Sequence, residues 1–269
     1  MRTTSKAELP QPSAEPVRRA GLFVRSHNGL EAAVERVRAV AREAGVEIVD
    51  EDPELVVVLG GDGTMLRAFH ENLGRAPVIG VNFGRFGFLA AIQPEGLEDG
   101  LRRAFAGDYV VLELPTLEFE HHGTRLAAVN DVVAATGSPG RIVELEWSIG
   151  GEPLGAIPCD GIIVATPQGS TAYNLSNNGP VLMWGIDAMA VSFVAPHSLV
   201  ARPLVVPRGR DIVVTSRTKS VQLTLIADGH VAGELALGEE VRVRLGDARV
   251  LMATLPDITF LTRFRSAFG

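Results

Sequence analysis

The sequence contains very little cysteine and no surplus of positive charge. Cys159 is the single cysteine among 269 residues, which excludes an internal disulfide and favours the reducing cytoplasm. Acidic residues outnumber basic ones by 32 to 25, which gives a formal net charge of −7. This balance argues against nucleic acid and anionic membranes as main partners, because both select for basic surfaces. A nucleotide stays possible, since it needs only a local basic patch.

Long apolar runs are also missing. The longest, residues 181–195, is too short to cross a bilayer and contains Asp187. Residues 1–19 are polar and contain prolines, without the apolar segment of a signal peptide, so we expect a flexible tail there. The remaining composition, 46% hydrophobic and 21% charged, is typical of a globular protein with one large or two medium domains.

Residues 20–108 alternate between strand-like and helix-like patterns. Apolar residues recur at helical spacing over residues 30–44, where Asn28 is expected to cap the helix and Gly45 to end it. A second helix is expected from residue 65 and a third over residues 97–105. Near-continuous apolar strands between such helices predict a Rossmann-like α/β domain with a parallel sheet covered on both faces. The expected strands are residues 21–24, 46–49, 55–59 and 77–81.

Residues 109–250 change to alternating or β-branched runs punctuated by glycine, proline and aspartate, which predicts a β-rich, sandwich-like domain. One helix is expected within it, over residues 170–177. Residues 251–269 are expected to return to the α/β domain, with a closing helix at residues 260–268. The expected strands are residues 110–114, 116–120, 126–134, 142–149, 162–165, 191–194, 212–215, 221–226 and 241–245.

The most informative motif, Gly60-Gly61-Asp62-Gly63-Thr64, directly follows the apolar strand at residues 55–59. Glycines let a backbone approach a ligand closely, and the N–H groups of such a turn attract phosphate. A carboxylate among these groups repels the anion, so Asp62 points to chemistry on a phosphorylated substrate. Taken alone, the motif would also fit a tight turn with a helix-capping aspartate.

Three further segments accompany the glycine motif: residues 82–89, the pair Asn130-Asp131, and residues 159–176. Together with residues 178–180, 195–207 and 227–230, this combination resembles the NAD kinase family over the chain from about residue 21 to the C-terminus. The glycine motif is shared with lipid kinases and phosphofructokinases, whereas the last of the three segments is highly specific. Its distinctive part is Thr166-Pro167-Gln168-Gly169-Ser170-Thr171-Ala172-Tyr173-Asn174-Leu175-Ser176.

The resemblance implies an enzyme that transfers a phosphoryl group from ATP to the 2′-hydroxyl of the adenosine ribose of NAD, which lies in a cleft between the two domains. Asp62 would be the catalytic residue that orients this hydroxyl and accepts its proton. Gly60, Gly61, Gly63 and Thr64 would bind the phosphates of ATP. The residues implied in NAD binding are Asp62, Gly63, Phe88, Asn130, Asp131, Arg141, Asp160, Thr171, Ala172, Tyr173, Asn174, Leu175, Ser176, Ala195 and His230.

The resemblance also implies partners and a metal. Mg²⁺ or another divalent ion would arrive with ATP, because we find no cluster of protein ligands that would hold it independently. We expect a cytoplasmic homodimer or homotetramer, with Asp160 acting at the nicotinamide side from a neighbouring subunit. Neither nucleic acid nor membrane is expected as a partner. The range of phosphoryl donors and the choice between NAD and NADH stay open.

Three positions depart from the family pattern, where we would expect threonine for Gln168, glycine for Asn178 and an amide near His230. Two other functions share some of these features: a lipid or sphingoid kinase, and a non-catalytic regulator that binds NAD(P). The dinucleotide-type segment argues against the first. The carboxylate of Asp62 argues against the second, because a pure binder would gain by losing it.

Overall fold

The computed structural model describes residues 15–25, 29–84, 87–137, 141–198, 201–219 and 221–269. The chain divides into two compact units, here called unit 1 (Met1–Glu113 with Val250–Gly269) and unit 2 (Leu114–Arg249). Unit 1 is therefore built from two separate stretches of sequence, while unit 2 is continuous. The domain boundaries expected from the sequence stay a prediction.

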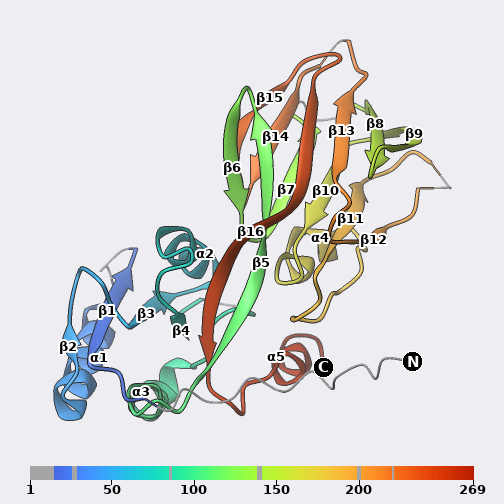
Figure 1. Ribbon diagram of the computed structural model, residues 1–269. Coiled ribbons are helices and arrows are strands. Elements are labelled where there is room, and N and C mark those ends of the chain that lie inside the picture. The colour runs from blue at the N-terminus through green and yellow to red at the C-terminus, as the bar shows by residue number, and fades with distance from the viewer. Residues whose placement is uncertain (1–14, 26–28, 85–86, 138–140, 199–200, 220) are drawn as a thin grey trace, which may run out of the picture. The chain divides into compact units, whose positions relative to one another are not determined.

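Unit 1 is built on a parallel sheet with the order β2-β1-β3-β4 and the end of β16 next to β4. Val78 of β4 pairs with Val56 on one side and with Met252 on the other, so the C-terminal segment extends the sheet (Figure 1). The strands are β1 (Arg19–Val24), β2 (Glu47–Ile48), β3 (Leu55–Gly60), β4 (Val78–Asn82) and β16 (Glu240–Thr254).

β3 is apolar and buried at every position, so it needs cover on both faces of the sheet. Leu55, Val57 and Leu59 belong to the same core as α1 and α3. On α2, which contacts β3 and β4, the Met65 sulfur lies so close to Gly80 that a side chain at Gly80 would collide with it. The helices of unit 1 are α1 (Glu31–Ala44), α2 (Asp62–Glu71), the short 3₁₀ turn η1 (Pro94–Gly96), α3 (Leu97–Phe105) and α5 (Phe260–Phe268).

Both ends of α1 lie close to the predicted helix at residues 30–44. Gly45 has a positive φ of 70°, and its N–H closes the last turn of the helix. At the other end the capping position is Leu30, which makes no side-chain cap, and Glu31 accepts the N–H of Gly29. Asn28, the expected cap, lies outside the described residues.

Unit 2 contains two antiparallel sheets. One has the order β16-β13-β8-β9, with β5 pairing to β16 and β6, and the other has the order β12-β11-β10-β7-β14-β15. The strands are β5 (Val110–His121, which begins in unit 1), β6 (Thr124–Ala128), β7 (Asp131–Thr136), β8 (Val143–Ile149), β9 (Glu152–Cys159), β10 (Gly161–Ala165), β11 (Ala188–Val194), β12 (Leu204–Pro207), β13 (Ile212–Ser216), β14 (Leu223–Ala227) and β15 (His230–Leu235).

The two sheets of unit 2 share one hydrophobic core, as in a β-sandwich. Trp147 of β8 and Phe193 of β11 meet edge to face across it, with their ring centroids 5.2 Å apart. The six-stranded sheet also buries its other face, where Ile163 of β10 packs near Leu182. The predicted fold class, an α/β domain followed by a β-rich domain with the C-terminal segment returning to the first, is confirmed.

Several predicted elements differ in detail from the observed ones. The two strands expected at 110–114 and 116–120 form the single strand β5, and the strand expected at 126–134 is interrupted by a turn at Asn130. The helix expected at 170–177 is the 3₁₀ turn η2 (Gly169–Thr171) followed by the single-turn α4 (Tyr173–Ser176). Strands β9, β12 and β15 were not predicted, because most of their residues are exposed and give no alternating apolar pattern.

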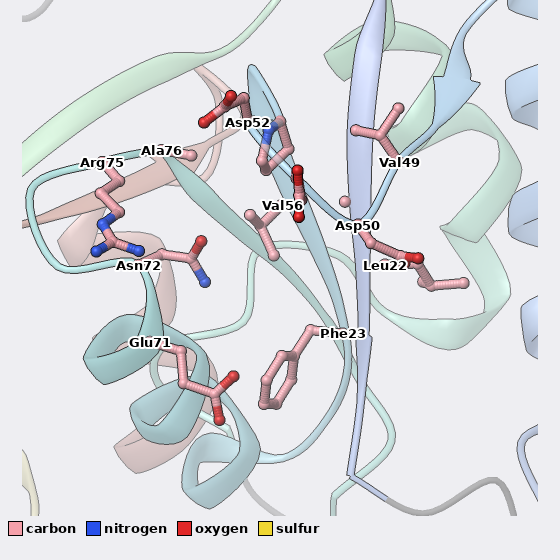
Figure 2. A pocket seen from close by; sticks show the side chains of 13 residues that line it. Leu22, Phe23, Val49, Asp50, Asp52, Val56, Glu71, Asn72, Arg75 and Ala76 are labelled. Carbon is pink, nitrogen blue, oxygen red and sulfur yellow. The ribbon is translucent and has the colours of Figure 1, made fainter.

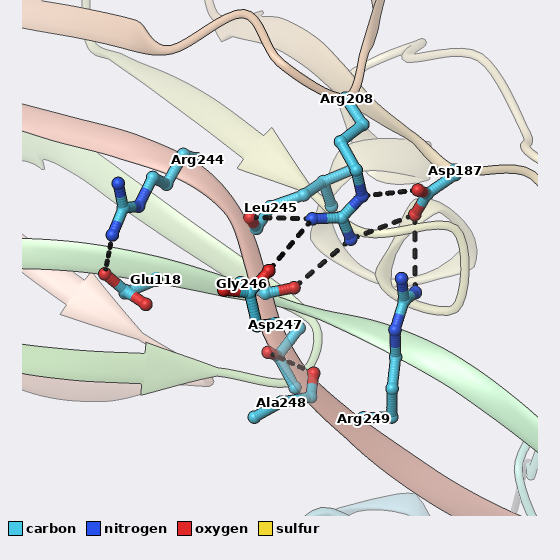
Figure 3. Close-up of polar contacts among 10 residues, drawn as sticks. Glu118, Asp187, Arg208, Arg244, Leu245, Gly246, Asp247, Ala248 and Arg249 are labelled. Atoms are coloured by element: carbon cyan, nitrogen blue, oxygen red, sulfur yellow. Dashed lines mark hydrogen bonds and ion pairs between the residues drawn. The ribbon is translucent and has the colours of Figure 1, made fainter.

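A polar network lies where β16 passes from its pairing with β13 towards unit 1 (Figure 3). The guanidinium of Arg208 donates to the main-chain oxygens of Leu245 and Gly246, at 3.1 and 3.2 Å, and forms an ion pair with Asp187. Asp187 also forms an ion pair with Arg249. The pKa of Asp187 lies below its usual range, chiefly because of the hydrogen bond from Arg208. These contacts satisfy main-chain oxygens at a point where the strand changes neighbours.

Candidate active site

The glycine motif forms the junction between β3 and α2. The sequence predicted a turn that holds Asp62 and a helix from residue 65, whereas α2 already begins at Asp62 with Gly61 in extended conformation before it. The Gly61 oxygen accepts the N–H groups of Thr64 and Met65 at 2.9 and 3.1 Å. The first N–H groups of a helix have no partner within the helix, so this end of α2 can bind an anion.

Two of the glycines are required by close packing. A Cβ at Gly60 would lie 2.6 Å from the Cβ of Thr64, and a Cβ at Gly61 would lie 3.3 Å from the Cα of Gly84. At Gly63 a Cβ would meet no described heavy atom within 4 Å. Gly60 and Gly61 therefore allow the turn to close, while Gly63 leaves open space beside Asp62.

The carboxylate of Asp62 is fixed by two backbone N–H groups. Phe88 donates to one oxygen at 2.9 Å and Leu89 donates to the other at 3.1 Å. Burial raises the pKa of Asp62 above its ordinary value, and the two N–H groups and the charge of Arg263 oppose this shift. The result is a partly buried carboxylate with a fixed orientation and an increased affinity for a proton, as a general base requires.

Phe88 contributes to this arrangement through its main chain. Its ring is only 7% exposed and packs on α5, with its centroid 5.4 Å from that of Phe260. As a wall for NAD, Phe88 stays a prediction. The backbone N–H of Phe88, in the segment that follows β4, donates a hydrogen bond to Asp62.

Arg263 of α5 was not predicted from the sequence. It is 6% exposed, and one of its nitrogens donates to the main-chain oxygens of Phe88, at 2.9 Å, and Ala90. The other terminal nitrogen donates to the Thr254 hydroxyl at 2.7 Å. The available signal was the helical spacing of Phe260, Phe264 and Phe268, which identifies an amphipathic helix but does not say that an arginine on it is buried.

In unit 2, the turn between β6 and β7 presents Asn130 and Asp131, and a single carboxylate organises it. Asp228 accepts the N–H groups of Val129, Asn130 and Asp131 at 2.7, 2.6 and 3.1 Å. The backbone N–H of Asp228 donates to the main-chain oxygen of Asp131 at 3.1 Å. Asp228 itself has a positive φ of 48° in the turn between β14 and β15. The sequence contained it in the matched segment 227–230, from which only His230 was selected.

The main-chain oxygens of the same turn are satisfied from the segment after β10. The Thr166 hydroxyl donates to the Val129 oxygen at 2.7 Å, and the Gln168 amide donates to the oxygens of Val129 and Pro115, both at 2.7 Å. A Cβ at Gly169 would overlap the Asn130 carbonyl. Gln168, one of the departures from the family pattern, therefore fills a buried position and ties this turn to β5.

Asp131 is a carboxylate with an unusually small exposed fraction, 5%. Burial, and then the nearby charge of Asp228, raise the pKa of Asp131 to about 7. Among the described residues, the side-chain oxygen of Asn130 is buried without a hydrogen-bond partner. Buried polar groups without partners are uncommon, so this pair is suited to a ligand with several hydroxyl or amide groups.

The predicted segment 171–176 forms a short polar surface next to this turn. Tyr173 is 43% exposed, whereas Asn174 is fully buried and donates to the main-chain oxygens of Ser170 and Pro180, both at 3.0 Å. Asn174 therefore holds the loop through its amide nitrogen, while its side-chain oxygen, like that of Asn130, has no hydrogen-bond partner among the described residues, and its contact with NAD stays a prediction. Asn178, where the family pattern has glycine, has a φ of 57°, a conformation that asparagine tolerates better than most residues. Thr171, Ala172 and Leu175 are half-buried, and Ser176 is exposed.

Other predicted residues of unit 2 lie at opposite ends of β10. Ala165, at one end, pairs with Asp131, while Gly161, at the other, pairs with Val194 and follows Asp160. Asp160 and the exposed Ala195 are therefore separated from Asp131 by the length of this strand, about 16 Å. His230 lies at the Ala165 end, where its Nδ1 atom is 3.0 Å from the main-chain oxygen of Asp228. Arg141 is exposed and precedes β8.

One cavity of unit 1 does not involve the glycine motif. Its volume is about 680 Å³, and Figure 2 shows it between β1, the start of β3 and the end of α2. Among the described residues that line it, Arg75 is the one cation and none is a predicted site residue. The acidic lining residues are Asp50, Glu51, Asp52 and Glu71. An acidic cavity is unsuited to phosphates, so we do not assign the substrates to it.

The described residues contain no group of three or more histidine, cysteine or carboxylate side chains that could hold a metal ion. In the same part of the chain, no helix has the length and apolar character needed to cross a membrane. Cys159 is buried, and burial raises the pKa of its thiol to about 12, which argues against a role as a nucleophile.

Comparisons with known proteins identify the family of the chain. Family models match two parts of the chain: the ATP-NAD kinase N-terminal domain at residues 13–109 and the C-terminal domain at residues 129–255. The chain is 37% identical over 235 residues to an NAD kinase of Gemmatimonas aurantiaca, covering 84% of this chain and 81% of that one. It is 35% identical over 274 residues to an NAD kinase of Thermobifida fusca, covering 95% and 82%.

Solved structures show the same fold. The yeast NADH kinase complexed with NADH superimposes with a TM-score of 0.80 at 21% identity, covering 93% of this chain and 87% of that one. An NAD kinase from Archaeoglobus fulgidus in complex with ATP gives a TM-score of 0.75 at 26% identity, covering 93% and 97%. With both family models and relatives above 30% identity over most of its length, the chain belongs to the NAD kinase family.

Proposed function

We propose that the chain phosphorylates the 2′-hydroxyl of the adenosine ribose of NAD with ATP, and that Asp62 is the proton acceptor. The observation that carries this proposal is the carboxylate of Asp62 at the start of α2, with both oxygens fixed by backbone N–H groups and its pKa raised by burial. The lipid kinase and the non-catalytic regulator are not favoured, because the chain matches NAD kinases over most of its length.

In the proposed reaction the 2′-oxygen attacks the γ-phosphorus in line with the departing ADP. The new O–P bond forms as the bond between the γ-phosphorus and the bridging oxygen breaks, and the hydroxyl proton passes to Asp62. Because the phosphoryl-transfer transition state is loose, orientation of the hydroxyl contributes more than early deprotonation. Gly60, Gly61, Gly63 and Thr64 would bind the phosphates of ATP at the N-terminal end of α2.

The metal is proposed to enter with the nucleotide as Mg²⁺ or another divalent ion, where it neutralises the charge of the triphosphate. The remaining lone pairs of Asp62 are proposed to serve the 2′-hydroxyl and its proton, so we do not assign the metal to this carboxylate. Among the residues that the structure describes, no set of three acidic, histidine or cysteine side chains offers another protein site.

NAD binding is proposed to depend on Asn130 and Asp131, whose side chains offer a hydrogen-bond acceptor without a partner and a buried carboxyl group. The neighbouring residues proposed to contribute are Thr171, Ala172, Tyr173, Leu175, Ser176 and His230. Ala195 is also proposed to contact NAD, and Asp160, at the opposite end of β10 from Asp131, is proposed to act from a neighbouring subunit within a homodimer or homotetramer. A cytoplasmic location is proposed on the single cysteine.

The test is to incubate the purified protein with NAD, ATP and Mg²⁺ and to measure NADP, with Asp62→Asn in parallel and Asp99→Asn, a change of an exposed carboxylate in unit 1, as the control. We expect Asp62→Asn to lower kcat about 100-fold or more while NAD still binds, since a positioned general base contributes about 10²–10⁴-fold. The control should keep the wild-type rate. Absence of NADP from a folded wild type, with NADH also tested, would overturn the proposed function.

A further inference from the structure

Arg263 is a charged side chain in the interior of unit 1, only 6% exposed. Burial lowers the pKa of Arg263 to about 10, which still leaves the guanidinium charged at neutral pH. A buried charge is costly unless it is compensated by hydrogen bonds and opposite charge. The residue on α5 therefore needs an explanation beyond packing, since an apolar side chain would fill this position at lower cost.

The compensation comes from the segment that holds Asp62. Residues 88–90 donate the N–H groups of Phe88 and Leu89 to the carboxylate of Asp62. The main-chain oxygens of Phe88 and Ala90 accept hydrogen bonds from Arg263. One short segment thus connects the proposed base to the buried cation, with its donors directed one way and its acceptors the other.

We propose that Arg263 is a positioning residue for Asp62: it fixes residues 88–90 so that their N–H groups meet the carboxylate, and it supplies the buried positive charge beside that carboxylate. This inference rests on the proposed function of Asp62. It extends that function to the C-terminal helix, which contributes no residue of its own to the predicted substrate contacts. The Thr254 hydroxyl, at 2.7 Å, fixes the other end of the guanidinium.

The charge is as important to the argument as the hydrogen bonds. Three influences oppose the effect of burial on Asp62: the N–H groups of Phe88 and Leu89, and the charge of Arg263. The charge of Arg263, on α5, acts on Asp62 in the direction that favours the ionised carboxylate. Removal of this charge should raise the pKa of Asp62 further, so the carboxylate would be protonated at a higher pH.

The experiment compares Arg263→Gln, which removes the charge, with Arg263→Lys, which keeps it but cannot reproduce the same set of hydrogen bonds. Arg265→Gln is the matched control, because Arg265 lies on the same helix and is exposed. For each folded protein we would measure kcat against pH and the KM values for NAD and ATP. Circular dichroism and thermal unfolding would establish folding.

Both changes at Arg263 should lower kcat about 10- to 100-fold with KM changed less than about threefold, because misplacement of a reacting group by about 1 Å costs on that order. In Arg263→Gln the acid limb of the kcat profile should move to higher pH, since the rate requires unprotonated Asp62. In Arg263→Lys the limb should stay near its wild-type position. Arg265→Gln should match the wild type in every respect.

Wild-type kcat and an unmoved acid limb in folded Arg263→Gln would overturn the positioning role while leaving the proposed function intact. Absence of NADP from the wild type would instead overturn the proposed function. If Arg263→Gln does not fold, Arg263→Lys and Thr254→Val carry the test. Both should lower kcat with little change in KM, and wild-type kcat in both would overturn the proposal.

Discussion

At the scale of single residues, Asp131 of the proposed NAD site is expected to reduce the stability of the folded protein. Its pKa of about 7 in the folded protein lies well above the value of about 3.9 expected when the chain is unfolded. Between these two values the folded state holds a proton that the unfolded state has released. Stability therefore falls as pH rises through this window, and above about pH 7 the full penalty of a buried charge is present.

We expect Asp131→Asn to raise the free energy of unfolding at pH 8 by about 1–3 kcal/mol and to change it much less at pH 5, where the aspartate is already neutral. Urea unfolding at the two pH values measures this difference. Asp247→Asn, a change of an exposed carboxylate in unit 2, should behave alike at both. An equal effect of Asp131→Asn at pH 5 and pH 8 would contradict the prediction. NAD binding should weaken in the same variant, because changes that stabilise a functional site commonly reduce its function.

At the scale of elements, the turn between β6 and β7 depends on Asp228 from a different hairpin. Three backbone N–H groups converge on its carboxylate, and hydrogen bonds to charged acceptors are stronger than those between neutral groups. Thr166 and Gln168 satisfy the oxygens of the same turn from the opposite side. Asn130 and Asp131 are thus oriented by residues that contact no substrate in the proposed mechanism.

Asp228→Asn replaces one acceptor oxygen by a donor, so the three N–H groups cannot all be satisfied. We expect the free energy of unfolding to fall by about 2–4 kcal/mol and the KM for NAD to rise about tenfold or more, with a smaller change in kcat. Glu239→Gln is the matched control, because that carboxylate accepts a single N–H, from Ala236, in a neighbouring turn. The control should keep the KM for NAD. An unchanged KM in Asp228→Asn would refute the positioning of this turn by Asp228.

At the scale of the whole molecule, the order of the chain makes unit 1 depend on its last residues. The end of β16 completes the parallel sheet, and Ala253 and Leu255 lie in the core of unit 1. Beyond them, α5 brings Arg263 to residues 88–90. Unit 2 is continuous in sequence and contains its own core. Loss of the C-terminus should therefore affect the two units differently.

We expect removal of residues 256–269 to increase hydrogen exchange at β3, β4 and residues 88–90 while unit 2 stays protected, and to abolish NADP formation. Hydrogen exchange followed by mass spectrometry measures both units in one sample. Removal of residues 266–269 alone keeps Arg263 and should leave exchange in β3 and β4 close to that of the full chain. A uniform increase throughout both units would contradict the prediction.

The fold class could be predicted from local patterns, whereas the proposed chemistry came from the resemblance of several motifs to the NAD kinase family. Period-3.6 and near-continuous apolar runs identified α1, α3 and the strands around β3, and the helix at residues 260–268 was predicted with the observed bounds. Glycine identified the end of α1 at Gly45. Exposed edge strands such as β9, with Pro153 and Pro158 within it, lacked an alternating pattern and were missed.

The sequence by itself determined which residues are available for chemistry, namely the glycine motif with Asp62 and the pair Asn130-Asp131. It also determined the family of the chain. Only the tertiary structure decided how these groups are held. Arg263 is 175 residues away from Phe88, and Asp228 is 97 residues away from Asp131. Neither contact follows from local spacing, because burial of a charge and the pairing of distant turns are set by packing of the whole unit.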